Sequence, residues 1–127
     1  MKPQEALAAL GRQAGMELAF NEQGLCRLRF DGRYVVDLEI SDDEREIFLY
    51  SRLGPLPGGE GGSGLLKRMM RAQYLGRETG RAAFGLDGDT LMAFCRVGLE
   101  GEDERALPGE LERFLDTLET WKTMLGA

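Results

Sequence analysis

The hydrophobic residues near the start of the chain recur with the 3.6-residue period of an α-helix. Leu7, Leu10 and Ala14 share one face of the segment 4–14, and Gly15 follows at a position where helices commonly end. We therefore expect a first helix over residues 4–14.

The next three apolar segments are predicted to be strands of an antiparallel sheet. Residues 26–30 and 34–40 alternate between apolar and polar positions, and Asp31-Gly32 between them favours a tight turn. Residues 47–53 are rich in β-branched and aromatic side chains on both faces, which predicts a strand covered on two sides. Together these segments form a three-stranded meander.

Glycine and proline interrupt the pattern after the third strand. Residues 54–64 hold two prolines and six glycines, a composition that favours a flexible connection over a helix or a strand. A second helix is predicted over residues 65–74, with an apolar stripe too broad for one buried face. We expect a homodimer in which a partner copy covers the rest of the stripe. The predicted interface residues are Leu65, Leu66, Met69, Met70 and Tyr74.

A second hairpin and a closing helix complete the pattern. Residues 82–86 and 91–99 flank the turn at Asp87-Gly88-Asp89. Pro108 marks the start of the last helix, whose apolar face runs to the C-terminus. The predicted order is α-β-β-β-α-β-β-α, an α+β fold in which a twisted antiparallel sheet packs with helices. A chain of 127 residues accommodates this as a single domain over residues 1–127.

Composition and charge narrow the possible partners. The 43% hydrophobic and 30% charged residues are typical of a folded, water-soluble domain. A formal net charge of -6 disfavours binding to nucleic acid and to anionic membranes. The sequence has neither an apolar stretch of about 20 residues nor a signal peptide, so we expect a cytoplasmic protein with no membrane partner.

The residue types that carry most enzyme chemistry are missing or isolated. The chain has no histidine, the commonest general base near neutral pH and the commonest metal ligand. Cys26 and Cys95 stand alone, without the second cysteine of a metal site or redox motif. Ser51 and Ser63 lack an evident activating base. We therefore expect no catalytic residues, no metal and no cofactor.

Residues 59–64 fit the G-x-G-x-x-G spacing of a dinucleotide-binding loop, but two features argue against that role. Glu60 would place a negative charge at the pyrophosphate, and the later strands form a hairpin where a Rossmann unit needs a parallel strand. Asp87 and Asp89 are better explained as turn residues than as a carboxylate pair. One alternative stays open: a small ligand-binding or carboxylate-based enzyme domain with a pocket between sheet and helices.

Four stretches, taken in order, resemble a known family over nearly the whole chain. They are the N-terminal helix with Leu7 and Leu10, residues 18–28, residues 48–54, and the closing helix with Phe114, Leu115 and Trp121. The pattern is similar to that of the class I chaperones of bacterial type III secretion effectors, the Tir chaperone family. The resemblance implies a non-enzymatic homodimer that binds the N-terminal segment of a secreted effector and keeps it soluble and secretion-competent without ATP or another cofactor.

The client groove of such a chaperone is expected at the first helix and the strands beside it. An extended client segment would bind there with apolar anchors and with hydrogen bonds along an exposed strand edge. The candidate client-binding residues are Leu7, Leu10, Leu25, Leu28, Phe30 and Val35. Alternation places Leu25 and Val35 on the sheet face opposite Leu28, which makes these two the better surface candidates. The net negative charge would suit a neutral or basic client.

Overall fold

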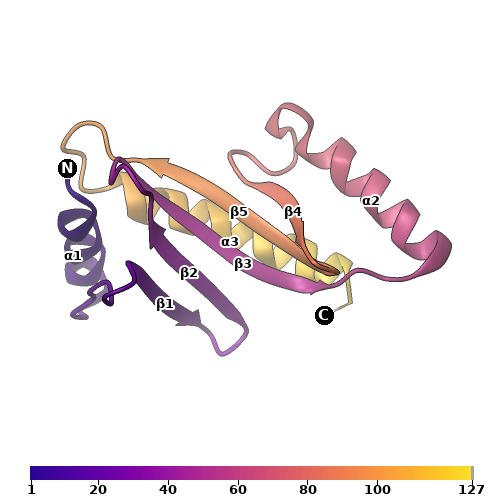
Figure 1. The fold of residues 1–127 in the computed structure, drawn as a ribbon, viewed down its shortest axis with the longest axis horizontal. Coiled ribbons are helices and arrows are strands. Elements are labelled where there is room, and N and C mark those ends of the chain that lie inside the picture. Colours follow the sequence, from indigo (N-terminus) through magenta and orange to yellow (C-terminus); the bar gives the residue numbers. More distant parts are fainter. Residues whose placement is uncertain (127) are drawn as a thin grey trace.

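Helices and strands follow one another in the order that the hydrophobic pattern predicted. The computed structural model describes residues 1–126, and Figure 1 shows the arrangement of its elements. The elements are α1 (Pro3–Ala14), β1 (Leu25–Phe30), β2 (Tyr34–Ile40), β3 (Glu46–Pro55), α2 (Gly59–Gln73), the short 3-10 helix η1 (Tyr74–Gly76), β4 (Ala83–Asp87), β5 (Thr90–Gly98) and α3 (Ala106–Met124). The α+β class and its element order are therefore confirmed, and only η1 lacked a signal in the sequence.

Two glycine-containing turns form as the sequence indicated. Gly15 ends α1 with a φ of 71°, and its N–H donates to the Arg12 carbonyl at 3.3 Å. Asp31 and Gly32 both have positive φ values, 53° and 66°, which is the backbone geometry of a tight hairpin turn. These turns fix where α1 stops and how β1 reverses into β2.

The five strands form one antiparallel sheet in the order β1-β2-β3-β5-β4. Leu38 on β2 lies opposite Cys26 on β1 and Leu49 on β3, and Leu49 lies opposite Cys95 on β5. One row of apolar side chains therefore crosses four strands on the same face. β1 and β4 are the two outer strands of the sheet.

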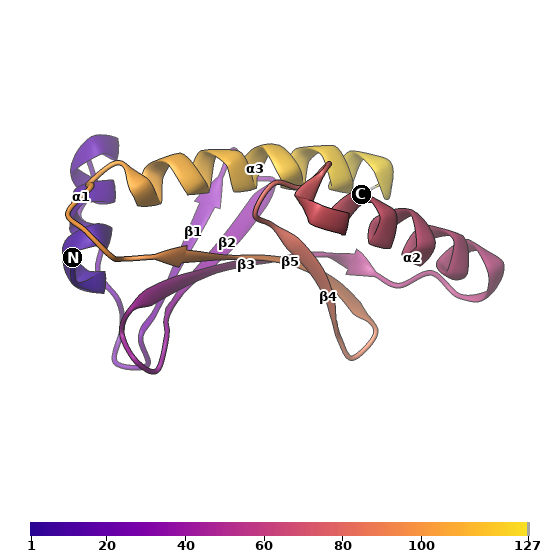
Figure 2. The same ribbon diagram turned by 90° about the horizontal axis from the view of Figure 1, so that it is seen from above.

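Helix α3 covers the apolar face of the sheet along its length. Figure 2 shows α3 above the sheet, with α1 at one end and α2 at the other. The α3 side chains Leu111, Phe114, Leu118 and Trp121 are buried against the sheet residues. Burial of this apolar surface supplies the main stabilising free energy of the fold, at roughly 25 cal/mol per Å². Within residues 1–126, no helix combines the length and the apolar character that a membrane crossing needs.

The opposite face of the sheet is open, which corrects one prediction. Residues 47–53 were expected to be covered on both faces, but α3 packs on only one of them. Phe48 and Tyr50 point to the other face and are partly buried by their strand neighbours. Aromatic and β-branched residues fit a half-covered strand as well as a fully covered one, so composition alone could not distinguish the two.

The connection predicted at residues 54–64 is also wrong in part. β3 continues to Pro55, and α2 begins at Gly59, so four of the glycines lie inside a helix. Tertiary packing overrides the low helix propensity of glycine here. A Cβ at position 62 would lie 1.9 Å from the Pro57 carbonyl oxygen, so this close approach of the chain requires glycine.

Candidate functional site at the outer edge of the sheet

β1 forms an outer edge of the sheet, and its backbone groups alternate between the two sides of the strand. The N–H of Ile40 donates to the Gly24 carbonyl at 3.0 Å, which sets the register in which the two strands pair. The peptide groups of Cys26, Leu28 and Phe30 therefore face β2. The peptide groups of Leu25, Arg27 and Arg29 face outward, away from the sheet.

Asn21 occupies one end of this edge. Its N–H donates to the Leu25 carbonyl at 2.8 Å, and its side-chain Oδ1 accepts the Leu25 N–H at 3.0 Å. Among the described residues, no such partner is present for the outward N–H and C=O groups of Arg27 and Arg29. These two residues define an open strand edge that another extended chain can pair with.

The outer edge at β4 is less accessible than the edge at β1. The side-chain Oε1 of Gln73, at the end of α2, accepts a hydrogen bond from the Phe84 N–H at 2.7 Å. That N–H faces outward, so an amide side chain already fills part of the position that a pairing strand would take. The structure therefore favours β1 as the edge for strand addition.

The side chains of β1 give its two faces different characters. Cys26, Leu28 and Phe30 are partly buried on the α3 side, where they extend the hydrophobic core to the edge of the sheet. On the other face, Arg27 Nε and Nη2 donate to the carboxylate of Asp37 at 2.8 and 3.1 Å. An added strand would meet apolar side chains on one face and arginines on the other.

The six predicted client-binding residues lie in three different places. Leu7 and Leu10 have exposed fractions of 0% and 7% and belong to the core. Leu28 and Phe30 line the α3 side of β1, where they are partly buried. Leu25 and Val35 are partly buried on the open face, as their alternation predicted. The four strand residues are thus placed at or beside the open edge, whereas the two helix residues support it from the core.

The open face of the sheet also carries an apolar area that the sequence pattern did not lead us to expect. Its side chains line a hollow of about 520 Å³ together with Glu39 and Arg96. The large apolar side chains among its lining residues are Phe48, Tyr50, Leu86, Met92 and Phe94. A signal was available, because the alternation that places Leu91 and Ala93 in the core also places Met92 and Phe94 on the opposite face.

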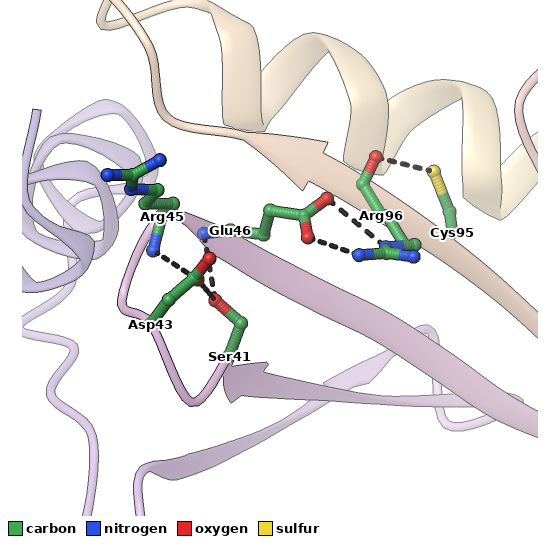
Figure 3. A network of polar contacts seen from close by, with 6 residues as sticks. All are labelled: Ser41, Asp43, Arg45, Glu46, Cys95 and Arg96. Carbon is green, nitrogen blue, oxygen red and sulfur yellow. Dashed lines mark hydrogen bonds and ion pairs between the residues drawn. The ribbon is translucent and has the colours of Figure 1, made fainter.

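Polar side chains form hydrogen bonds within the β2–β3 turn and between the neighbouring strands β3 and β5 (Figure 3). Ser41 Oγ and the Arg45 N–H donate to Asp43 Oδ1 at 2.8 and 3.0 Å. The hydrogen bond from the Arg45 N–H, followed by the one from Ser41, lowers the pKa of Asp43. Nearby, the guanidinium of Arg96 forms a two-point ion pair with the carboxylate of Glu46 across β5 and β3. These contacts stabilise the β2–β3 turn and the pairing of β3 with β5 beside the apolar hollow.

The predicted interface residues, on α2 and at the start of η1, divide into two groups. Met69 is buried and Leu65 and Leu66 are partly buried, so they pack within the chain. Met70 and Tyr74 are exposed by 63% and 62%. The second half of α2 is anchored by Arg68, which pairs with Glu78 at 2.8 and 2.6 Å and lies over the Trp121 ring at 5.3 Å. Met70 is therefore exposed on a helix that an ion pair and a cation–π contact connect to the rest of the chain.

A polar cavity of about 510 Å³ between the segment 78–82, β5 and α3 is where the alternative enzyme or ligand site would lie. The Glu110 carboxylate accepts a hydrogen bond from Arg113 at 2.6 Å and lies 3.6 Å from Arg81, so its charge is already compensated. Burial, together with the nearby Glu110, raises the pKa of the Cys95 thiol to about 11. A thiol with that pKa stays protonated near neutral pH and is a poor nucleophile.

Comparison with known proteins identifies relatives along nearly the whole chain. A family model described as the Tir chaperone protein (CesT) family matches residues 5–122. A protein of Chlamydia pneumoniae is 31% identical over 103 residues, which cover 76% of this chain and 79% of the relative. The family match includes the candidate edge at β1.

Solved structures share the same fold. The Yersinia pestis type III secretion chaperone SycH, in complex with a stable fragment of YscM2, matches with a TM-score of 0.74 and 21% identity, covering 93% of this chain and 98% of that one. The ExsC–ExsE complex gives a TM-score of 0.77 at 18% identity, covering 98% and 97% of the two chains. The HopA1–SchA chaperone–effector complex gives 0.76 at 17% identity, covering 93% and 91%. At these identities the structures establish the fold.

Proposed function

The chain belongs to the Tir chaperone protein family, and from this premise we propose that it is a cytoplasmic type III secretion chaperone of bacteria. It binds the extended N-terminal segment of a secreted effector and keeps that effector soluble and secretion-competent. Binding requires no ATP, metal or other cofactor. The observation that carries the proposal is the β1 edge, where the peptide groups of Arg27 and Arg29 face outward beside the apolar side chains of Leu28 and Phe30.

The client pairs with β1 as an additional antiparallel strand. The two N–H and two C=O groups at Arg27 and Arg29 supply main-chain hydrogen bonds, each worth about 0.5–1.5 kcal/mol net. Apolar client side chains cover Cys26, Leu28 and Phe30 and add about 25 cal/mol per Å² of buried apolar surface. Ordering an unfolded segment opposes these gains, so a stable complex needs contacts beyond the edge as well.

The active form is a homodimer that uses the exposed face of α2. Met70 projects from α2, which Arg68 anchors to the rest of the chain. Tyr74 and Leu75, in η1 just beyond α2, are exposed by 62% and 78%. Large apolar side chains that are exposed within a short stretch of the surface are typical of an interface between copies. A dimer would present two β1 edges, and a long client segment could engage both.

Affinity capture from the native bacterium, followed by mass spectrometry, tests the function. We expect one secreted protein to dominate the captured material, and to bind through its N-terminal segment when ATP is removed. Capture of a metabolic enzyme in place of a secreted protein, or a client that binds only when ATP is present, would contradict the proposal.

Two matched variants test the use of the β1 edge. Arg27→Pro and Arg27→Ala both remove the ion pair with Asp37, but only proline also removes the outward N–H. Proline is tolerated on an edge strand when its nitrogen faces outward, so both variants should fold. We expect Arg27→Pro to lose the client and Arg27→Ala to keep it. Equal capture by two folded variants would place the client elsewhere on the chaperone.

A further inference from the structure

Arg29 is a solvent-exposed cation on the open edge, and no acidic side chain of residues 1–126 lies within ion-pair distance of it. The strand residue opposite Arg29 is Val35, which has no charge. Arg27, two residues before it, already pairs with Asp37. The edge thus carries one compensated and one uncompensated guanidinium on the same face.

A second exposed arginine lies at the same end of the hairpin. Arg33 follows the turn after β1, and its guanidinium lies over the Tyr34 ring at 5.2 Å. The Lys122 ammonium donates to the Arg33 carbonyl at 3.3 Å and adds another basic group there. Asp31 lies in the turn, and Asp37 lies further along β2, where it pairs with Arg27. Arg33 and Lys122 both lie over the ring of Tyr34, whose side chain is on the core face, whereas Arg29 lies on the open face opposite Val35. Basic groups therefore lie on both faces of this hairpin end, although the whole chain has a net charge of -6.

Strand register decides which side chains of a bound segment would meet these groups. A residue that exchanges hydrogen bonds with Arg29 in an antiparallel pair lies directly opposite it, with its side chain on the same face. The two flanking residues of the segment then lie beside Phe30 and Leu28 on the apolar face. A residue two positions further along lies opposite Arg27.

We propose that the β1 edge selects an extended segment in which apolar and acidic residues alternate, with an acidic side chain directly opposite Arg29. The inference rests on the proposed strand addition at β1 and names the chemistry of the segment that binds there. It differs from the expectation set by the net charge, which favours a neutral or basic client. The position opposite Arg27 selects less strongly, because Asp37 already compensates that guanidinium.

Three designed peptides with capped ends test the charge preference. Their common sequence is Ser-Val-X-Val-X-Val-Ser, with Glu, Gln or Lys at both X positions. Binding to the full chain is followed by the NMR shifts of the Arg27 and Arg29 amides, which also report the position of the peptide. An opposed ion pair on a sheet changes pairing by up to about fivefold, and like charges weaken it comparably. We therefore expect the Glu peptide to bind about five- to tenfold more tightly than the Lys peptide.

Charge reversal at Arg29 provides the matched control. Arg29→Glu should invert the order of the Glu and Lys peptides. Arg105→Glu changes the net charge by the same amount at a side chain that is 90% exposed and lies at the start of α3, and it should leave the order unchanged.

The other outcomes distinguish failure of the charge preference from failure of strand addition at β1. If all three peptides shift the β1 amides equally, or if Arg105→Glu alters the order as much as Arg29→Glu, the edge binds strands without selecting acidic residues, and the inference fails alone. If no peptide shifts these amides, the inference fails. If the captured effector also leaves them unshifted, the proposed use of β1 fails with it.

Discussion

Asn21 and Leu25 exchange two hydrogen bonds that close one end of the β1 edge. The Asn21 N–H donates to the Leu25 carbonyl at 2.8 Å, and the Leu25 N–H donates to Asn21 Oδ1 at 3.0 Å. The same Oδ1 accepts the Gln23 N–H at 2.9 Å. One side chain thus holds the turn before β1 and marks where the open part of the edge begins.

Replacing Asn21 by Ala should destabilise the fold by about 1 kcal/mol, because two backbone N–H groups lose their acceptor. Urea denaturation measures the loss in the free energy of unfolding. Hydrogen exchange should accelerate at the Leu25 amide and stay unchanged at the Leu49 amide in the middle of the sheet. Unchanged exchange at Leu25 would show that the side chain of Asn21 does not protect this end of β1.

The glycines at the start of α2 should respond to alanine in opposite directions. A Cβ at position 61 or 64 would meet no atom within 4 Å, so Gly61→Ala and Gly64→Ala should each stabilise by about 0.5–1 kcal/mol through helix propensity. Gly62→Ala should destabilise, because its Cβ would lie 1.9 Å from the Pro57 carbonyl oxygen. Urea denaturation of the three variants checks the signs, and three equal effects would contradict the packing of this turn.

Met70→Glu should convert the proposed dimer into a monomer, since it places a charge on the exposed apolar face of α2. Sedimentation at micromolar concentration provides the measurement. Met124→Glu makes the same change at another exposed methionine, at the end of α3, and should leave the dimer intact. A wild-type monomer, or a dimer that survives Met70→Glu, would refute the interface on α2.

Asp43 should contribute to the acid sensitivity of the fold. Its pKa is lowered in the folded chain by the hydrogen bonds from the Arg45 N–H and Ser41 Oγ. The stabilisation is therefore present above the unfolded-state pKa of about 4 and is lost as the pH falls through the lower folded-state pKa. The difference in unfolding free energy between the wild-type protein and Asp43→Asn should shrink as the pH falls below about 4. A difference that stays constant across this range would exclude a role for the Asp43 charge.

The candidate site could be predicted only in part from the sequence. Alternation correctly placed Leu25 and Val35 on the face opposite Leu28, because the direction of a strand side chain follows from the local period of two. The period of 3.6 residues places Leu7 and Leu10 on one apolar face of the first helix, which fits a core position as well as a client groove. Packing with α3, more than 90 residues away in the sequence, decided that these two side chains belong to the core. The role of Asn21 likewise depends on a turn geometry that its residue type permits but does not require.

The sequence by itself determined the order of the elements, the end of α1 and the turn at Asp31-Gly32, since periodicity and glycine geometry act over a few neighbouring residues. Only the tertiary structure decided that the sheet keeps one open face, that residues 59–64 join α2, and that β1 is the more accessible edge. These features depend on contacts that no local pattern encodes, such as the close approach of Gly62 to Pro57 and the hydrogen bond between Gln73 and Phe84. Packing and hydrogen bonds between distant parts of the folded chain stabilise these features. Their contribution outweighs the local propensities of the residues involved.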